Sequence, residues 1–227
     1  MVLSFPSLVQ QSLGDRVAQE LRVRIIGGEL ARGTRLVEDV LAEQFDVSRG
    51  PIRDAFRQLE AEGLLESRRR GVFVIGLTED DVDELYTLRG SLETLALSLA
   101  MRRAAPEDWA RAEECSRAME SAAQRRDASA FARADLEFHA QLYQLSGHRR
   151  LLAVWEQYRP TFGVMLDVTN AQDIDLHPAA EAHAELLRLA RTGDEEGAVT
   201  NLRGHLLGAQ NRLRSALRAT QSSAAED

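Results

Sequence analysis

Two side chains of types that can bind metal ions stand four residues apart in the segment RADLEFHAQLY, at positions 133–143. They are Asp135 and His139. In a helix this spacing places both on one face, about one turn apart. Leu136, Phe138 and Leu142 make the surroundings apolar. A carboxylate and an imidazole in such a setting raise the question of a shared ligand, and they need further partners before they indicate a metal site.

Two further histidines have helical, apolar neighbours that include small residues. His183 lies in EAHAELL and His205 in NLRGHLLG. Three helices could therefore bring one carboxylate and three imidazoles together inside a bundle. The alternative is a set of hydrogen-bonded core histidines, because the 22 residues between His183 and His205 match no metal-binding motif.

The elements that must position these residues follow residue 76, and all of them are predicted helices. Thr78, Asp127 and Asp194 are suitable N-caps, Pro106 and Pro178 mark helix starts, and Gly147 and Gly193 mark ends. The sequence predicts a six-helix bundle. Its helices are expected at 78–103, 106–126, 127–147, 149–169, 178–193 and 194–220.

The first third of the chain has a different pattern. Helical spacing covers 8–30, 38–45 and 48–62, with Gly27-Gly28 ending the first helix and GTRL at 33–36 forming a turn and a short extended piece. Two β-like runs follow, at 64–67 and 71–76. This order predicts a winged helix-turn-helix.

Arginines mark two places in this module. Arg49, Arg53 and Arg57 follow i, i+4, i+8 spacing beside an apolar stripe, and Arg57 is expected to pair with Glu60. Arginine can grip phosphates or pair with guanine in the major groove. A second cluster, Arg68 to Arg70, joins the two β-like runs. On the helix alone a solvated face is the simpler reading, whereas the whole module favours DNA binding.

Composition supports the division into two parts. Residues 1–76 contain 11 Arg and 11 acidic residues, whereas residues 77–227 contain 17 Arg and 25 acidic residues. The overall acidity argues weakly against a nucleic-acid partner, but residues 1–76 have no net charge, so this argument does not apply to them. The single cysteine excludes an intrachain disulfide. No signal peptide or membrane-spanning run is present, so a cytoplasmic protein is expected.

Residues 12–76 resemble the DNA-binding domain of the GntR superfamily of bacterial transcription regulators. The resemblance lies in LVEDVLAEQFDVSRGPIRDAFRQLEAEGLL followed by RRRGVFV. Asp46 stands where the family usually has Gly, and Gly50 where Thr is common. The resemblance implies DNA contacts from the start of the recognition helix and from the wing. The implied residues are Ser48, Arg49, Gly50, Pro51, Arg53, Arg69, Arg70 and Gly71.

Residues 78–220 resemble the FCD effector domain of the FadR subgroup. The matching pieces are LRGSLE, DLEFH, HAELL and GDEEGAVTNLRGHL. The resemblance implies that a divalent ion is bound and that Arg89 holds an effector carboxylate. His148 replaces a common Asn, and His177 is expected in a loop or at an N-cap. The implied metal ligands are Asp135, His139, His183 and His205.

The sequence thus predicts a mainly α protein, with a winged helix-turn-helix at 1–76 and an all-α six-helix bundle at 77–227. We expect a ligand-responsive transcription regulator, not an enzyme, that binds a palindromic operator as a homodimer. Its ion would be Zn, Ni, Fe or Mn, and its effector a small organic acid. Two alternatives stay open: a metal-dependent enzyme with Glu93 or Glu137 as a base, and a purely structural metal.

Overall fold

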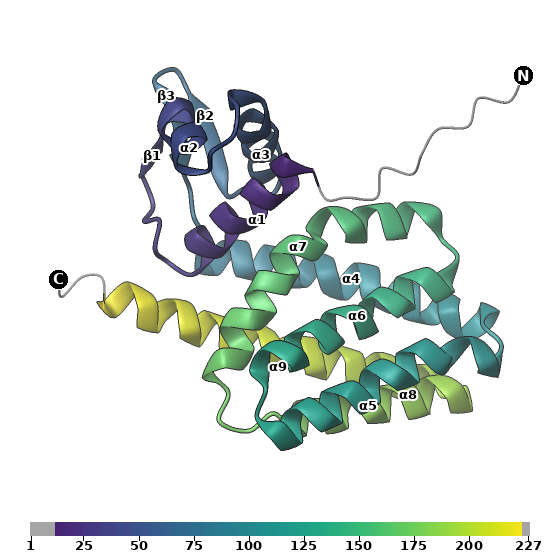
Figure 1. The fold of residues 1–227 in the computed structure, drawn as a ribbon. Coiled ribbons are helices and arrows are strands. Elements are labelled where there is room, and N and C mark those ends of the chain that lie inside the picture. Colours follow the sequence, from purple (N-terminus) through teal and green to yellow (C-terminus); the bar gives the residue numbers. More distant parts are fainter. Residues whose placement is uncertain (1–11, 224–227) are drawn as a thin grey trace, which may run out of the picture. The chain divides into compact units, whose positions relative to one another are not determined.

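The computed structural model describes residues 12–223 of the chain (Figure 1). It divides into two compact units, Met1–Gly76 and Leu77–Asp227. Among the described residues, no helix combines the length and apolar character needed to cross a bilayer.

Three helices and a small sheet form the first unit. Their bounds are α1 Leu13–Ile26, β1 Arg35–Leu36, α2 Glu38–Gln44, α3 Arg49–Ala61, β2 Leu65–Arg68 and β3 Gly71–Val74. The capping box between Ser12 and Asp15 starts α1. The predicted start of that helix at residue 8 lies outside the described residues.

The sheet has three strands rather than the predicted two. Its order is β1-β3-β2, and both pairings are antiparallel. The extra strand is the extended piece around Arg35, which pairs with Phe73. Two residues are too short to show a strand period in the sequence, so only the pairing reveals this strand.

The second unit is the predicted helical bundle. Its bounds are α4 Glu79–Arg103, a 3₁₀ turn Pro106–Trp109, α5 Ala110–Arg125, α6 Ala128–Ser146, α7 Arg149–Gln172, α8 His177–Thr192 and α9 Glu195–Ser223. Thr78 and Asp81 form a capping box at the start of α4, and Asp127 accepts a bond from the Ala130 amide at the start of α6. His177 is the first residue of α8, so it is neither a loop residue nor the N-cap.

Helix packing brings the four helices that matter for the site together. Helix α6 packs against α4, α5 and α7, while α9 packs against α4, α7 and α8. The interior is apolar and includes Leu97, Met119, Phe131, Phe138 and Leu202. Several polar side chains are nonetheless buried, among them Arg89 and Glu93 of α4, Asp135 and His139 of α6, and His183 of α8.

Candidate metal centre and nucleic-acid interface

The arginine row of the first unit lies on the outer face of α3. Ile52, Ala55, Phe56 and Leu59 pack inward, which turns the arginines to solvent. Arg49 Nε lies 2.5 Å from the Asp39 carboxylate, and Arg53 Nε donates to Glu38 at 2.8 Å. Exposed ion pairs of this kind are weak, so both guanidinium groups can exchange these acids for phosphates or bases.

Arg57 has a different partner from the expected one. It pairs with Asp54, one turn back, rather than with Glu60. Both acids lie three residues away, so spacing alone does not choose between them.

The turn before α3 explains one departure from the family pattern. Asp46 has a φ of 51° and lies in the left-handed region, where Gly is the usual residue and Asp is tolerated. Ser48 occupies the N-cap position of α3, but its side chain makes no capping hydrogen bond. A Cβ at Gly50 would meet only the Ser48 Oγ, at 3.8 Å, so packing within the unit does not require glycine there. The start of α3 is therefore an open, polar surface.

The tip of the wing is cationic. Arg69 and Arg70 are exposed in the turn between β2 and β3, whereas Arg68 pairs with Glu66 and lies over the Phe73 ring. Gly71 has a φ of 129°, and a Cβ there would lie 2.9 Å from Arg35 Nε. The backbone at the wing therefore needs glycine.

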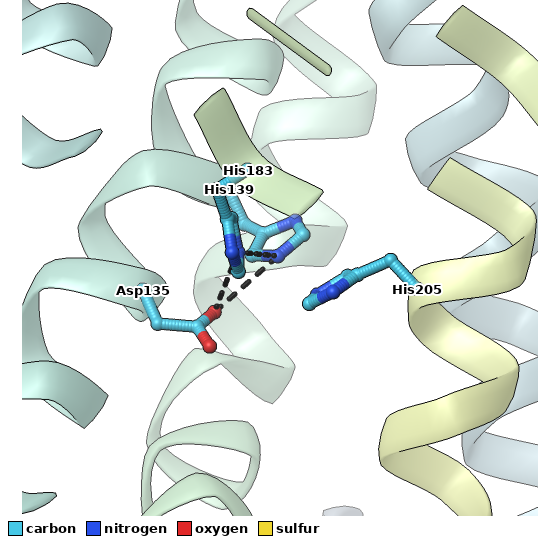
Figure 2. A group of neighbouring side chains, drawn as sticks. All are labelled: Asp135, His139, His183 and His205. Carbon is cyan, nitrogen blue, oxygen red and sulfur yellow. Dashed lines mark hydrogen bonds and ion pairs between the residues drawn. The ribbon is translucent and has the colours of Figure 1, made fainter. Parts of the chain in front are cut away.

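The second unit gathers the four expected metal ligands in one place. Asp135 and His139 come from α6, His183 from α8 and His205 from α9, as Figure 2 shows. One ligand atom from each lies within 4.8 Å of the other three. Asp135, His139 and His183 are buried, and His205 is partly buried. In the described part of the chain this is the one such group of three or more His, Cys, Asp and Glu side chains.

The imidazoles of His139 and His183 face each other through their Nε2 atoms. His183 Nδ1 lies 2.7 Å from the Ala179 carbonyl, which can only accept, so a neutral His183 carries its proton on Nδ1. Its Nε2 therefore presents a lone pair, 3.2 Å from His139 Nε2 and 3.5 Å from Asp135 Oδ1. Two lone pairs this close repel each other unless a proton or a metal ion lies between them. Two nitrogens bound about 2.1 Å from one ion lie about 3.0 Å apart at a right angle and about 3.4 Å apart at the tetrahedral angle, so the donor set fits a metal.

Electrostatics within the cluster also favours a cation. Burial by itself raises the pKa of the Asp135 carboxyl, but His183 and His139 outweigh it and hold that pKa well below its usual value. Burial, reinforced by His183 and His139, holds the pKa of His205 well below its ordinary value. The site thus offers one carboxylate anion and a neutral imidazole from His205.

Arg89 is buried beside the cluster, on α4. Its Nε donates to Glu93 Oε1 at 2.6 Å, and its Cζ lies 5.2 Å from the centre of the Phe162 ring. Within the described residues, the Arg89 Nη2, the Tyr86 hydroxyl and the Trp155 Nε1 are buried without a hydrogen bond. Buried donors without partners are costly, so each of these three atoms can take an acceptor oxygen.

The structure gives fixed partners to both glutamates of the enzyme alternative. The sequence nominated Glu93 and Glu137 as bases, yet Glu93 is held between Arg89 and His139, and Glu137 is held by Arg159 and Gln141. The i, i+4 spacing of Arg89 and Glu93 was the available signal for the first pair. His148 caps α7 by accepting from the Leu151 amide, outside the ligand cluster.

Known proteins share both units of this chain. Residues 13–75 match the family described as bacterial regulatory proteins, gntR family, and residues 84–208 match the FCD domain. A probable D-xylose utilization operon transcriptional repressor of Paenarthrobacter nicotinovorans is 32% identical over 203 residues, which cover 88% of each chain. The gluconate operon transcriptional repressor of Bacillus licheniformis is 36% identical over 67% of this chain and 63% of its own length. The match thus spans less than two thirds of that repressor.

A solved structure supports the same fold. The E. coli protein McbR/YncC superposes with a TM-score of 0.72 at 24% identity, covering 91% of this chain and 99% of its own. Fold and site together define a helix-turn-helix protein with a second, helical unit that encloses a polar cluster. The family matches place it further: the chain belongs to the gntR family of bacterial regulatory proteins and carries an FCD domain.

Proposed function

We propose that this protein is a ligand-responsive transcription regulator whose bundle binds a divalent ion and a small organic acid. The observation that supports it most is the buried cluster of one carboxylate and three imidazoles in a chain that also carries a winged helix-turn-helix. The relatives reported above are named as repressors, which favours a regulator over an enzyme.

DNA binding would use α3 and the wing. The start of α3, with Arg49 and Arg53, would enter the major groove, while Arg69 and Arg70 would contact the backbone beside it. Ser48, Gly50 and Pro51 shape the start of that helix, and Gly71 allows the wing backbone.

A palindromic operator requires two copies of this module, so we expect a homodimer. A dimer related by a two-fold axis presents two recognition helices to two half-sites. Light scattering at micromolar concentration should give twice the chain mass of 25.2 kDa. A scattering mass equal to one chain at all concentrations up to that range would contradict it.

The ion would be held by Asp135, His139, His183 and His205. Nitrogen and carboxylate ligands suit Zn, Ni, Fe or Mn. Four protein ligands on an octahedral ion would leave two positions for a ligand from solution. When bound, the ion supplies a Lewis-acidic contact for oxygen atoms of that ligand.

The charge of the buried set favours an anionic effector. Arg89, Glu93 and Asp135 together carry one excess negative charge, and a divalent ion would change this to one excess positive charge. A monocarboxylate neutralises that excess. The unpartnered Arg89 Nη2, Tyr86 hydroxyl and Trp155 Nε1 would donate to further oxygens of the acid. The name of the gluconate operon repressor makes sugar acids the first candidates.

A thermal-shift screen of sugar acids and hydroxy acids, starting with gluconate, tests this assignment. An acid at a hundredfold excess over its dissociation constant should add about 2.7 kcal/mol of stability to metal-loaded protein. EDTA-treated protein and Arg89→Met should lose this gain. Arg159→Met, which also removes an arginine that pairs with a glutamate, should keep it. Equal stabilisation of all four samples would contradict the docking mode.

The effector would act by binding one conformation of the protein more tightly than the other. It can release DNA only if it binds more tightly to the conformation that does not fit the operator, because equal affinity for both shifts nothing. Anisotropy titrations of the operator with and without the acid measure that difference directly.

A further inference from the structure

Glu93 lies at the centre of the polar cluster, although it belongs to neither set of proposed ligand contacts. It comes from the middle of α4 and is completely buried. Its Oε1 accepts from Arg89 Nε at 2.6 Å, and its Oε2 lies 2.6 Å from His139 Nδ1. The side chains of Arg89, Glu93 and His139 are 1%, 0% and 0% exposed. One carboxylate thus joins the arginine to a metal ligand.

On the imidazole side, Glu93 fixes which nitrogen of His139 is protonated. A carboxylate against Nδ1 keeps the proton there and leaves the lone pair of Nε2 toward Asp135 and His183. An outer carboxylate of this kind orients a metal-bound histidine and makes it a more basic ligand. The Ala179 carbonyl orients His183 in the same way, by accepting from its Nδ1.

Glu93 also orients Arg89 and so determines which N–H groups of the guanidinium remain available to a ligand. The contact uses Nε, while Nη2 is buried without a hydrogen bond in the described part of the chain. Phe162 and Tyr86 flank the guanidinium, with its Cζ 5.2 Å and 5.9 Å from their ring centres. Guanidinium donors form a rigid fork, so holding Nε sets the direction of the remaining donors.

We propose that Glu93 is a positioning residue that couples the metal site to the acid-binding arginine. This inference rests on the proposed function of the same cluster. One carboxylate orients both His139 and Arg89, so a bound metal and a bound acid both act on the position of Glu93. We expect each to strengthen the binding of the other, and linkage requires the factor to be the same in both directions.

The test is Glu93→Gln, measured first with metal alone. Arg89 and His139 face different oxygens of Glu93, and an amide keeps an acceptor at only one of these two positions, so in this geometry it cannot accept from both. We expect affinity for Zn²⁺, measured by competition with a chromophoric chelator, to fall by about 10- to 100-fold. At saturating Co²⁺ the visible absorption spectrum should also differ from that of the unchanged protein, because His139 has lost its orienting partner.

Glu137→Gln is the matched control. Glu137 lies on α6 between the two α6 ligands in sequence and pairs with Arg159 at 2.6 Å, but its described contacts are with Arg159 and Gln141 rather than with a histidine. It should leave Zn²⁺ affinity and the Co²⁺ spectrum unchanged. If Glu93→Gln and Glu137→Gln bind Zn²⁺ equally well, the inference is wrong.

Glu93→Gln leaves Arg89 buried without its anion and could therefore fail to fold. A second variant keeps the test informative in that case. Glu93→Gln combined with Arg89→Met removes both charges and places an apolar chain beside Phe162. It should fold and still show a loss of Zn²⁺ affinity of about 10- to 100-fold, because the amide oxygen that then accepts from His139 Nδ1 lacks the charge by which a carboxylate makes the imidazole a more basic ligand. Affinity equal to that of the unchanged protein would overturn the proposal. Failure of the unchanged protein itself to bind Zn²⁺ or Co²⁺ would instead reject the proposed metal site.

Discussion

Replacing His183 with alanine should remove the bound metal and lower the melting temperature. The side chain is completely buried, its Nδ1 is fixed by Ala179, and its Nε2 lies within 3.5 Å of both His139 and Asp135. No neighbouring donor replaces it, and the three remaining ligands bind more weakly. Because an ion that binds only the folded state stabilises that state, its loss removes about 2.7 kcal/mol for free metal at a hundredfold excess over the dissociation constant.

Elemental analysis of protein purified without chelators or a histidine tag measures the metal, and calorimetry measures the melting temperature. His177→Ala is the matched control, since His177 opens the same helix but is exposed and pairs with Asp175 outside the cluster. It should retain one ion per chain. Finding no metal in the unchanged protein would reject the site, and equal metal in both variants would remove His183 from the ligand set.

Replacing Arg53 with alanine should weaken specific DNA binding by about 1–3 kcal/mol. Arg53 lies on the exposed face of α3, one turn beyond Arg49, and its contact with Glu38 is a surface ion pair that DNA can displace. Fluorescence anisotropy on the palindrome upstream of the gene, compared with a scrambled duplex, separates specific from general binding.

Two other arginines give contrasting outcomes. Arg70→Ala should weaken binding to both duplexes alike and reduce the salt dependence, because a wing arginine would contact phosphates. Arg111→Ala should change neither, since Arg111 forms a similar exposed pair with Glu114 in the helical unit. If Arg53→Ala leaves operator affinity unchanged, α3 does not read the bases.

Local sequence signals predicted the helices and their order well. Each of these signals lies within one or two turns of the helix end that it determines. They are the capping box at Thr78, the Asp127 cap and the glycines at 147 and 193. The i, i+4 spacing of Asp135 and His139 likewise predicted two donors on one face of α6, and their side chains do converge.

The sequence could not decide features that depend on contacts distant along the chain. Strand β1 has two residues and exists only through its pairing with β3. The role of Glu93 required its meeting with His139, 46 residues further on.

The sequence alone therefore determined which residues could bind a metal and on which helices they stand, because residue type and helical period are local properties. Only the tertiary structure decided that they meet. His183 lies 44 residues beyond His139, and His205 stands on another helix, so nothing in their spacing fixes a common point. The packing of α6, α8 and α9 brings their donor atoms within 4.8 Å, since burying the apolar faces of these helices turns the same faces, and the histidines on them, toward one interior.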